Sequence, residues 1–392
     1  MTDFLKRTWA VIDLDCLDFN IEALHSRLSS GTKIMAVVKA DGYGHGDHAI
    51  AEELSRKGVD FFAVSNLAEA RSLRRGGIDS DILILGFTPP SCAGELAGLH
   101  LTQTVFSSEY AELLSGSCRE AGVSVRVHIK LDTGMNRIGF PAFHSDTAVK
   151  KVSEACRLPN LNFEGIFTHL SSADSLDSNS IAYTQMQVKR FSTAVSALEK
   201  QGIHFSCRHM QNSAGIAFLP SVHYDYVRAG IVLYGVAPSS EPLPFAIRPV
   251  MELKTVISMV KRVPPNSAVS YNRRYVSDRE MKIATVPIGY ADGYPRSLSN
   301  KAEMLLHGKR VPVIGSVCMD QLMLDVSDID DVCMGDVVTV VGKDGGESIQ
   351  FDELAALAQT ISYELMCLIG RRVPRVYIKG GKTVGVVDYV GE

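Results

Sequence analysis

The sequence has no long hydrophobic run, little excess of charge and no secretion signal. Its longest apolar stretches fall well short of the roughly 20 residues that a membrane-spanning helix requires. It has 40 basic and 44 acidic residues, a net charge of -4, and no basic stripe of the kind that binds nucleic acid. The amino-terminal stretch MTDFLKRTWAVIDLD carries charges where a signal peptide needs an uncharged apolar block. We therefore expect a cytoplasmic protein that binds neither membranes nor nucleic acid.

Paired cysteines and metal-binding motifs are also missing. The eight cysteines are scattered singly, without a Cys-x-x-Cys pair, so no disulfide framework is indicated. We expect them to be thiols, mostly buried. His45 and His48 stand three residues apart, but no acidic or thiolate partner accompanies them at metal-ligand spacing. No metal site is predicted.

The sequence does contain a regular alternation of strand-like and helix-like segments. Short apolar runs typical of strands in a parallel sheet occupy 34–39, 60–65, 81–86, 102–106, 124–130, 162–169, 205–210 and 224–228. Helix-like stretches at 66–75, 107–121 and 182–200 fill gaps between them. Eight strands alternating with helices over this length favour an α/β fold of the (β/α)8 TIM-barrel type over an open sheet.

The composition changes after residue 236. The segment VAPSSEPLPFAIRPV contains four prolines, which suits a domain junction. Strand-like segments follow at 251–263, 281–290, 309–317, 321–327 and 336–342, and only 351–370 returns to helical spacing. We predict a barrel domain over 1–240 and a smaller, mostly β domain over 241–392. The first strand, at 8–14, is a candidate to pack with the second domain.

Chemically active residues recur at the predicted strand ends, where the active sites of such barrels lie. Lys39 follows the unbroken apolar run Ile34 to Val38, so we interpret it as the last residue of a core strand. The later strand ends carry Lys130, with Arg137 in the next loop, His169 and Arg228. This pattern predicts a site built around a lysine.

The loops after the seventh and eighth strands frequently bind phosphate in these barrels. Here they offer Ser213 and the backbone amides of Gly230 and Ile231. A desolvated lysine can form a Schiff base with an aldehyde while a phosphate cradle holds the other end of the same molecule. The combination suggests pyridoxal phosphate as cofactor.

Nine short motifs carry a family resemblance along nearly the whole chain. They are, in order, AVVKADGYGHG, KLDTGMNRIGF, THLSSAD, NSAG, VRAGIVLYG, VSYNRRY, PIGYADGYPR, GSVCMDQ and YELMC followed by RVPR. Together they resemble the successive signatures of bacterial alanine racemase, a barrel-type (fold-type III) pyridoxal phosphate enzyme. One departure is visible: Lys39 is followed by Asp41 and Gly42, where the family more often has Asn and Ala. We interpret this pair as a local turn variant.

The resemblance implies two catalytic bases. Lys39 would hold the cofactor as an aldimine and act on the α-proton of D-alanine, and Tyr271 would act on that of L-alanine. Inversion needs a proton removed from one face of the carbon and returned to the other, which one rigid group rarely reaches. The family assignment places Tyr271 in the second domain of the partner subunit, so a homodimer with shared active sites is expected.

The remaining implied roles concern binding. The resemblance assigns the phosphate to Tyr43, Ser213, Gly230, Ile231 and Tyr363, the pyridine nitrogen to Arg228 with support from His169, and the substrate to Arg137, Met319 and Tyr290. Lys130 matches a lysine that is carbamylated in many relatives.

Three kinds of protein remain as hypotheses. The first is an alanine racemase that supplies D-alanine for peptidoglycan, or a relative acting on serine or a broader range of amino acids. The second is a fold-type III amino-acid decarboxylase, which Arg228 and the VSYNRRY tyrosine disfavour, because decarboxylases of this plan place an acid at the pyridine nitrogen. The third is a single-barrel cofactor-binding protein, which residues 240–392 disfavour.

Overall fold

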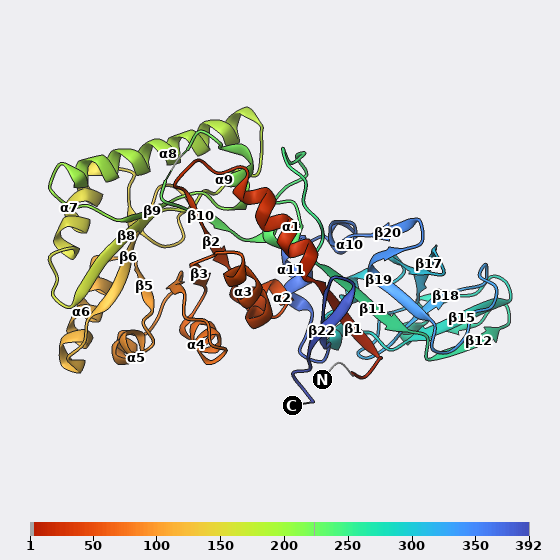
Figure 1. Ribbon diagram of the computed structural model, residues 1–392. Helices are drawn as coiled ribbons and strands as arrows, with labels where there is room; N and C mark the ends of the chain where they lie inside the picture. The colour runs from red at the N-terminus through yellow and green to blue at the C-terminus, as the bar shows by residue number, and fades with distance from the viewer. Residues whose placement is uncertain (1–3, 223, 392) are drawn as a thin grey trace. The chain divides into compact units, whose positions relative to one another are not determined.

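The structure, a computed structural model, describes residues 4–222 and 224–391 (Figure 1). The chain divides by its internal contacts into two compact units. The barrel unit consists of Asp18–Gly42 and Asp47–Arg248. The β unit consists of the residues up to Leu17, of Tyr43–Gly46, and of the residues from Pro249 onward.

The barrel unit contains a closed parallel barrel. Its strands are β2 (Lys33–Val37), β3 (Phe61–Val64), β4 (Asp81–Ile84), β5 (Thr102–Val105), β6 (Val125–Asp132), β8 (Leu161–Phe167), β9 (Cys207–His209) and β10 (Tyr226–Ala229). They pair in the order β5-β4-β3-β2-β10-β9-β8-β6, and β5 pairs with β6 to close the ring. A short strand, β7 (Phe140–Pro141), adds to β6. The predicted (β/α)8 fold is confirmed.

Helices connect the strands and lie outside them (Figure 1). They are α1 (Leu14–His25), α2 (Lys39–Gly44), α3 (Asp47–Arg56), α4 (Leu67–Arg75), α5 (Ala93–Gly98), α6 (Ser108–Ala121), α7 (Ser145–Ala155), α8 (Ser178–Glu199) and α9 (Ser213–Phe218), with short 3-10 turns η1 (Pro90–Cys92) and η2 (Ile231–Tyr234). Local sequence sets several of their starts. Asn66, Ser107 and Asp177 cap α4, α6 and α8, each accepting hydrogen bonds from backbone amides of the first turn.

The strand that leads to the lysine ends earlier than predicted. β2 stops at Val37, so Lys39 is not the last strand residue but the first residue of the turn α2. The residues from Ala40 to Gly44 all have positive φ, between 52° and 81°, so the turn is left-handed. This conformation costs roughly 1–2 kcal/mol for most residues with a Cβ. The cost is smaller for aspartate and asparagine, and glycine adopts the conformation readily. Such strain is concentrated at functional sites.

The Asp41-Gly42 variant fits this turn. Gly42 has φ +59°, and the Oδ1 of Asp41 accepts a hydrogen bond from the backbone amide of Asp47 at 3.1 Å. A Cβ on Gly42 would make only ordinary contacts, the nearest at 3.4 Å to the Asp47 backbone. Glycine is therefore favoured at this position by the positive φ angle, and not because neighbouring atoms leave no space for a side chain.

Substituting Gly42→Ala should lower the free energy of unfolding by about 1 kcal/mol, because the added Cβ is strained at this φ angle. The matched control is Gly116→Ala in the interior of α6, where the new methyl group meets open space. That variant should gain up to about 1 kcal/mol from helix propensity. Urea unfolding of both variants measures the difference, and equal effects would contradict the left-handed turn.

The β unit is built on one large mixed sheet. Its strands are β1 (Thr8–Asp13), β11 (Met251–Val256), β12 (Met259–Val263), β15 (Met281–Val286), β16 (Glu303–Leu306), β17 (Lys309–Ile314), β18 (Leu322–Asp325), β19 (Val337–Asp344), β20 (Glu347–Ile349), β21 (Arg375–Lys379) and β22 (Lys382–Val387). The order is β12-β15-β18-β17-β16-β19-β11-β1-β21-β22, with β20 on β19. The strand expected at 8–14 is β1, which lies antiparallel to β11 and parallel to β21.

Smaller elements complete this unit. They are the hairpin strands β13 (Ala268–Val269) and β14 (Tyr275–Val276), the 3-10 turns η3 (Tyr271–Arg273), η4 (Tyr290–Asp292) and η5 (Arg296–Leu298), and the helices α10 (Phe351–Ala358) and α11 (Ser362–Leu368). The segment 251–263, predicted as one strand, forms two strands. β11 lies antiparallel to β19, and β12 lies antiparallel to β15. The strands of this unit that were not predicted are β13, β14, β16, β20, β21 and β22.

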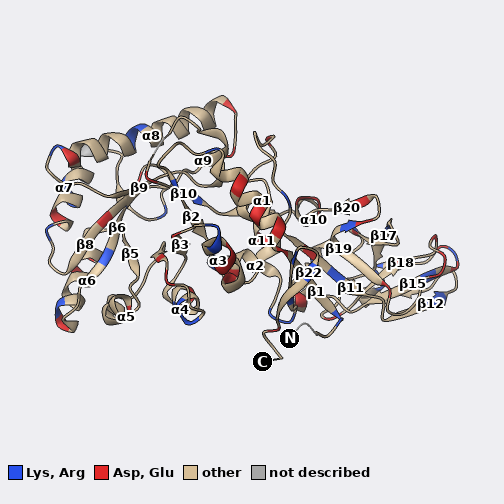
Figure 2. Ribbon diagram, viewed as in Figure 1, with Lys and Arg blue, Asp and Glu red and all other residues tan. Residues whose placement is uncertain are grey.

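Charged residues of both signs are interspersed along the helices and loops of the chain (Figure 2). Within the described residues, no helix is long and apolar enough to cross a membrane. No cysteine forms a disulfide, but the expectation that most are buried was wrong: only Cys118 and Cys207 are. Of the others, Cys16, Cys92, Cys156 and Cys318 are half-buried, and Cys333 and Cys367 are exposed.

Candidate functional site

Arg228, on β10, is buried at the carboxyl end of the barrel, with 3% of its surface exposed. Its guanidinium donates hydrogen bonds to His209 Nδ1 at 2.7 Å and to the carbonyl oxygens of Thr168 and Met210 at 2.7 and 2.8 Å. His169 Nδ1 lies 3.3 Å away. All four acceptors are uncharged groups, and within the described chain no carboxylate forms a salt bridge with Arg228. Its positive charge is therefore not neutralised.

His169 lies among basic residues at the same end of the barrel. Its pKa is lowered well below the usual range by burial, and further by the charges of Arg228, Lys130, Arg137 and Lys39. Burial and Arg137 lower the pKa of Arg228 to about 9, so it stays charged at neutral pH. The site is electropositive, and it suits a ligand with several negative charges.

Lys130 is enclosed within this cluster. Lys130, Arg137, Thr168 and His169 line one small cavity, and the Lys130 Nζ lies 4.5 Å from the centre of the Phe167 ring. Burial, followed by the charges of Arg228 and Arg137, lowers the pKa of Lys130 well below that of an exposed lysine. The lowered pKa favours the uncharged form of the amine, which is its nucleophilic form.

A group of small donors lies after β9 and β10. Ser213 begins α9, and its Oγ accepts a hydrogen bond from the backbone amide of Gly230 at 3.1 Å. The same helix is capped by Asn212, whose side chain accepts from the Gly215 amide at 3.0 Å. The structure thus brings together Ser213 and Gly230, which the sequence places 17 residues apart, and Ile231 follows directly. A hydroxyl with adjacent backbone amides is the donor set that binds phosphate.

In the β unit, Tyr271 is presented on a strained turn between β13 and β14. Its side chain is 70% exposed. The neighbouring residues Ser270, Asn272 and Arg273 have φ values of +65°, +60° and +50°. Two hydrogen bonds hold the turn to Ser316: Ser270 Oγ donates to the Ser316 carbonyl at 2.7 Å, and Ser316 Oγ donates to the Tyr271 carbonyl at 3.2 Å. A large exposed aromatic side chain on a strained turn that hydrogen bonds hold in place is typical of a functional position.

Tyr290 and Met319 are held side by side in the same unit. The amide of Tyr290 donates to the Cys318 carbonyl at 3.1 Å, and that of Ala291 donates to the Met319 carbonyl at 3.0 Å. A Cβ on Gly289 would lie 2.3 Å from these two carbonyl oxygens, so only glycine permits the approach. Tyr290 and Met319 are 44% and 53% exposed, so both are available to a ligand.

Asp292 anchors this pair of loops. Its side chain is fully buried and forms a bidentate ion pair with Arg7, at 2.8 and 2.9 Å. It also accepts from the Gly289 amide at 3.0 Å, and Arg372 lies 3.7 Å away. The N-terminal segment thereby fixes the loop that carries Tyr290.

Substituting Arg7→Ala should lower the free energy of unfolding by about 2 kcal/mol, because it leaves the Asp292 carboxylate buried without its main partner. This figure lies below the range for fully buried pairs, since Arg7 is itself 25% exposed and Arg372 remains nearby. The control is Arg262→Ala, whose ion pair with Glu280 is exposed on both sides, and it should cost less than about 0.5 kcal/mol. Chemical denaturation measures both, and equal costs would contradict the anchoring role.

Tyr43 and Tyr363 also meet within the β unit. Their ring centres are 6.2 Å apart at a tilt of 56°, and Tyr43 is 7% exposed. Tyr363 lies in α11. The sequence places these residues 320 positions apart in the chain, and the fold places their rings in contact.

Two buried residues were missed by the sequence interpretation. His128 and His209 lie behind Arg228, both fully or almost fully buried. The alternation of side chains along a strand could have indicated His128. It stands two residues before Lys130 on β6, so both side chains point to the same face of the strand. His209 is the last residue of β9, so it stands at a strand end, as the other predicted site residues do.

Comparison with known proteins identifies relatives along the whole chain. The model of the alanine racemase N-terminal domain matches residues 12–238, and that of the C-terminal domain matches residues 250–377. An alanine racemase from Desulfovibrio desulfuricans is 46% identical over 97% of this chain and 100% of its own length. Alanine racemase 1 from Clostridium acetobutylicum is 42% identical, covering 98% of this chain and 99% of its own. The structure of alanine racemase from Bacillus anthracis with bound L-Ala-P has a TM-score of 0.93 at 35% identity, covering 99% of each chain.

The (β/α)8 barrel with a cationic site at its strand ends, followed by a mostly β unit, defines a class of pyridoxal phosphate enzymes. Within that class, the chain belongs to the alanine racemase family. The residues present fit the cofactor of this family: a buried, uncompensated guanidinium suits an unprotonated pyridine nitrogen, and the Ser213 hydroxyl beside the Gly230 amide suits a phosphate.

Proposed function

We propose that the protein racemises alanine with pyridoxal phosphate as cofactor, in the cytoplasm and as a homodimer, and that it supplies D-alanine for peptidoglycan. The observation that supports this most strongly is Arg228, which is buried among uncharged acceptors where a decarboxylase of similar plan would have an acid. An arginine donates but does not give up its proton, so the pyridine nitrogen it faces stays unprotonated. The cofactor, when bound, supplies the electron sink that makes the α-proton of the amino acid removable.

The two proton transfers are assigned to Lys39 and Tyr271. Lys39 would hold the cofactor and exchange the α-proton of D-alanine. Tyr271 would exchange that of L-alanine from the opposite face, and it would come from the partner subunit. An exposed tyrosine on a rigid turn suits this role, because it can reach a site outside its own unit without a change of backbone conformation.

The remaining residues would bind and orient the ligands. Arg137 and the backbone of Met319 would receive the substrate carboxylate, and Tyr290 would narrow the pocket to small side chains. Tyr43, Ser213, Gly230, Ile231 and Tyr363 would hold the phosphate. His169 would support Arg228, whose guanidinium it contacts.

Lys130 should be carbamylated, because burial lowers the pKa of its amine and so favours the uncharged, reactive form, and because the positive Arg137 lines the same cavity. The expected result is a carbamate signal in ¹³C NMR after equilibration with ¹³C-bicarbonate, absent in Lys130→Ala. Because the lowered pKa favours the uncharged amine, we expect the signal at neutral pH, and it should fall on acidification, as protonation releases carbon dioxide. No signal at neutral pH would contradict the modification.

The experiment that tests the function is incubation of the holoenzyme in deuterated water with L-alanine and, in a separate reaction, with L-serine, followed by chiral separation and mass analysis. We expect D-alanine with one deuterium at the α-carbon. Unlabelled, wholly L alanine together with racemised serine would leave the cofactor and fold in place but overturn the substrate. Loss of carbon dioxide from an amino acid would favour the decarboxylase instead.

A further inference from the structure

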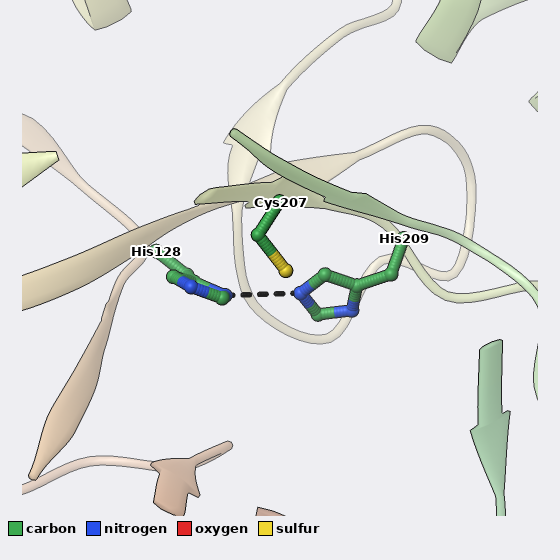
Figure 3. Close-up of side chains that lie close together, drawn as sticks. All are labelled: His128, Cys207 and His209. Carbon is green, nitrogen blue, oxygen red and sulfur yellow. Dashed lines mark hydrogen bonds between the residues drawn. The ribbon is translucent and has the colours of Figure 1, made fainter. Parts of the chain in front are cut away.

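Behind Arg228, the barrel contains a cluster of three buried side chains from two strands: His128 on β6, and Cys207 and His209 on β9 (Figure 3). The ring atoms His128 Nδ1 and His209 Nε2 are 3.0 Å apart, and His209 Nδ1 faces the Arg228 guanidinium at 2.7 Å. The two histidines therefore form a hydrogen-bonded chain with Arg228, from His128 through His209 to the guanidinium, that leads from the barrel core to the proposed cofactor site.

The direction of each hydrogen bond follows from the arginine. A guanidinium can only donate, so His209 Nδ1 must accept and carry no proton. A neutral His209 therefore has its proton on Nε2 and donates it to His128 Nδ1. His128 in turn carries its own proton on Nε2. Burial lowers the pKa of His128 to about 3 and that of His209 well below its usual value, so both rings are neutral.

Packing leaves both rings little freedom. The edge of Phe61 meets the His128 ring at 5.8 Å, and Phe167 stacks on His209 at 4.6 Å with 9° between the planes. Gly165 gives the His128 ring its place, because a Cβ there would lie 2.5 to 2.6 Å from three ring atoms. The pairing of β6 with β8 shifts register at His128, as in a β-bulge that re-aims a side chain.

We propose that His128, acting through His209, is a positioning residue that fixes the direction of the Arg228 guanidinium without neutralising its charge. A carboxylate in place of this neutral chain would also orient Arg228, but it would offset the charge that the pyridine nitrogen faces. The inference rests on the proposed function for its consequence in catalysis, and on geometry alone for the tautomers.

The cluster also has the ligand types of a zinc site, since one ligand atom from each of the three residues lies within 4.8 Å of the others. The tautomers argue against this use. His209 Nε2 carries a proton as long as Nδ1 accepts from Arg228, and burial raises the pKa of the Cys207 thiol to about 12. A cation here would also lie next to the unneutralised guanidinium.

The test compares two substitutions of similar size. His128→Asn keeps an acceptor near the position of Nδ1, whereas His128→Leu removes it. The readout is the ratio of transamination, in which the amino group and α-hydrogen of alanine pass to the cofactor aldehyde and pyruvate is released, to racemisation. His128→Leu should raise this ratio on the order of tenfold, because the buried His209 donor loses its partner and Arg228 loses its fixed direction. His128→Asn should stay within about twofold of the wild type.

A purely structural role predicts a different outcome. It would lower the free energy of unfolding and the rates of both reactions, but leave their ratio unchanged; that result, or equal ratios for the two variants, overturns the proposal. Independently of activity, long-range ¹H–¹⁵N NMR of the cofactor-free protein should show both histidines as neutral Nε2-protonated tautomers. A proton on His209 Nδ1, or one zinc ion bound per purified chain, overturns the assignment. If the wild type did not racemise alanine, the proposed function would fail while the NMR result still decided the tautomers.

Discussion

A Lys39→Ala variant will lose alanine racemisation in both directions by at least about 10⁴-fold, because it loses a proton-transfer group and the covalent attachment of the cofactor together. Borohydride reduction of the wild-type holoenzyme, followed by proteolysis, should leave the cofactor on the peptide that contains Lys39. The variant should yield no such peptide. Activity of each preparation is measured from both enantiomers by chiral chromatography.

The control for this prediction is Lys33→Ala at the start of β2, the strand that precedes Lys39. Lys33 is largely exposed and forms a surface ion pair with Asp60, so its loss should leave the racemisation rate within about twofold of the wild type. Cofactor recovered on any peptide other than the one containing Lys39, or comparable activity of the two variants, would contradict the assignment of Lys39.

A Tyr271→Phe variant will separate the two faces of the α-carbon. Racemisation should fall about 10²- to 10⁴-fold, the usual contribution of one positioned acid or base. It should fall equally in both directions, because the equilibrium between two enantiomers is fixed. Exchange of the α-hydrogen with solvent should behave differently: D-alanine should still exchange, through Lys39, whereas exchange from L-alanine should fall together with racemisation.

The measurement is deuterium incorporation into each enantiomer at early times, by mass spectrometry after chiral separation. Tyr275→Phe provides the control. This tyrosine lies on the neighbouring strand β14, and its hydroxyl contacts Met281 within the β unit, so both exchange rates should be unchanged. Equal loss of exchange from both enantiomers in Tyr271→Phe would show that the tyrosine does not serve one face.

The fold of the barrel could be predicted because its signals are local. A strand buried on both faces needs a continuous apolar run. The eight runs can be identified in the sequence without knowing which strands pair with one another. Eight strands alternating with helices favoured a closed barrel over an open sheet, and the pairing of β5 with β6 closes the ring. The β unit was harder: the strand β22, for example, is exposed or half-buried along its whole length, so it lacks the buried face by which a strand is identified.

The ends of elements, and the conformations just beyond them, could not be predicted to the same degree. Lys39 follows β2 by two residues, in a left-handed turn that is unfavourable for most of its members. Local propensity would reject such a turn, so its occurrence reflects contacts made by distant parts of the chain, such as Arg375, whose guanidinium donates to the Gly44 carbonyl at 2.9 Å. Strain of this kind is stable only where the surroundings over-determine it.

The sequence by itself determined the class of fold, the lysine after the first strand of the barrel, and the set of cations that make an anion-binding site, since each depends on residue type and spacing along one segment. Only the tertiary structure decided how these groups are tuned. The chain from His128 through His209 to Arg228 joins residues that are 81 and 19 positions apart. The burial that lowers the pKa of Lys130 likewise comes from residues distant in the sequence, such as Thr168 and His169. Hydrogen-bond direction and desolvation depend on what surrounds a side chain in space, and that information exists only once the barrel has closed.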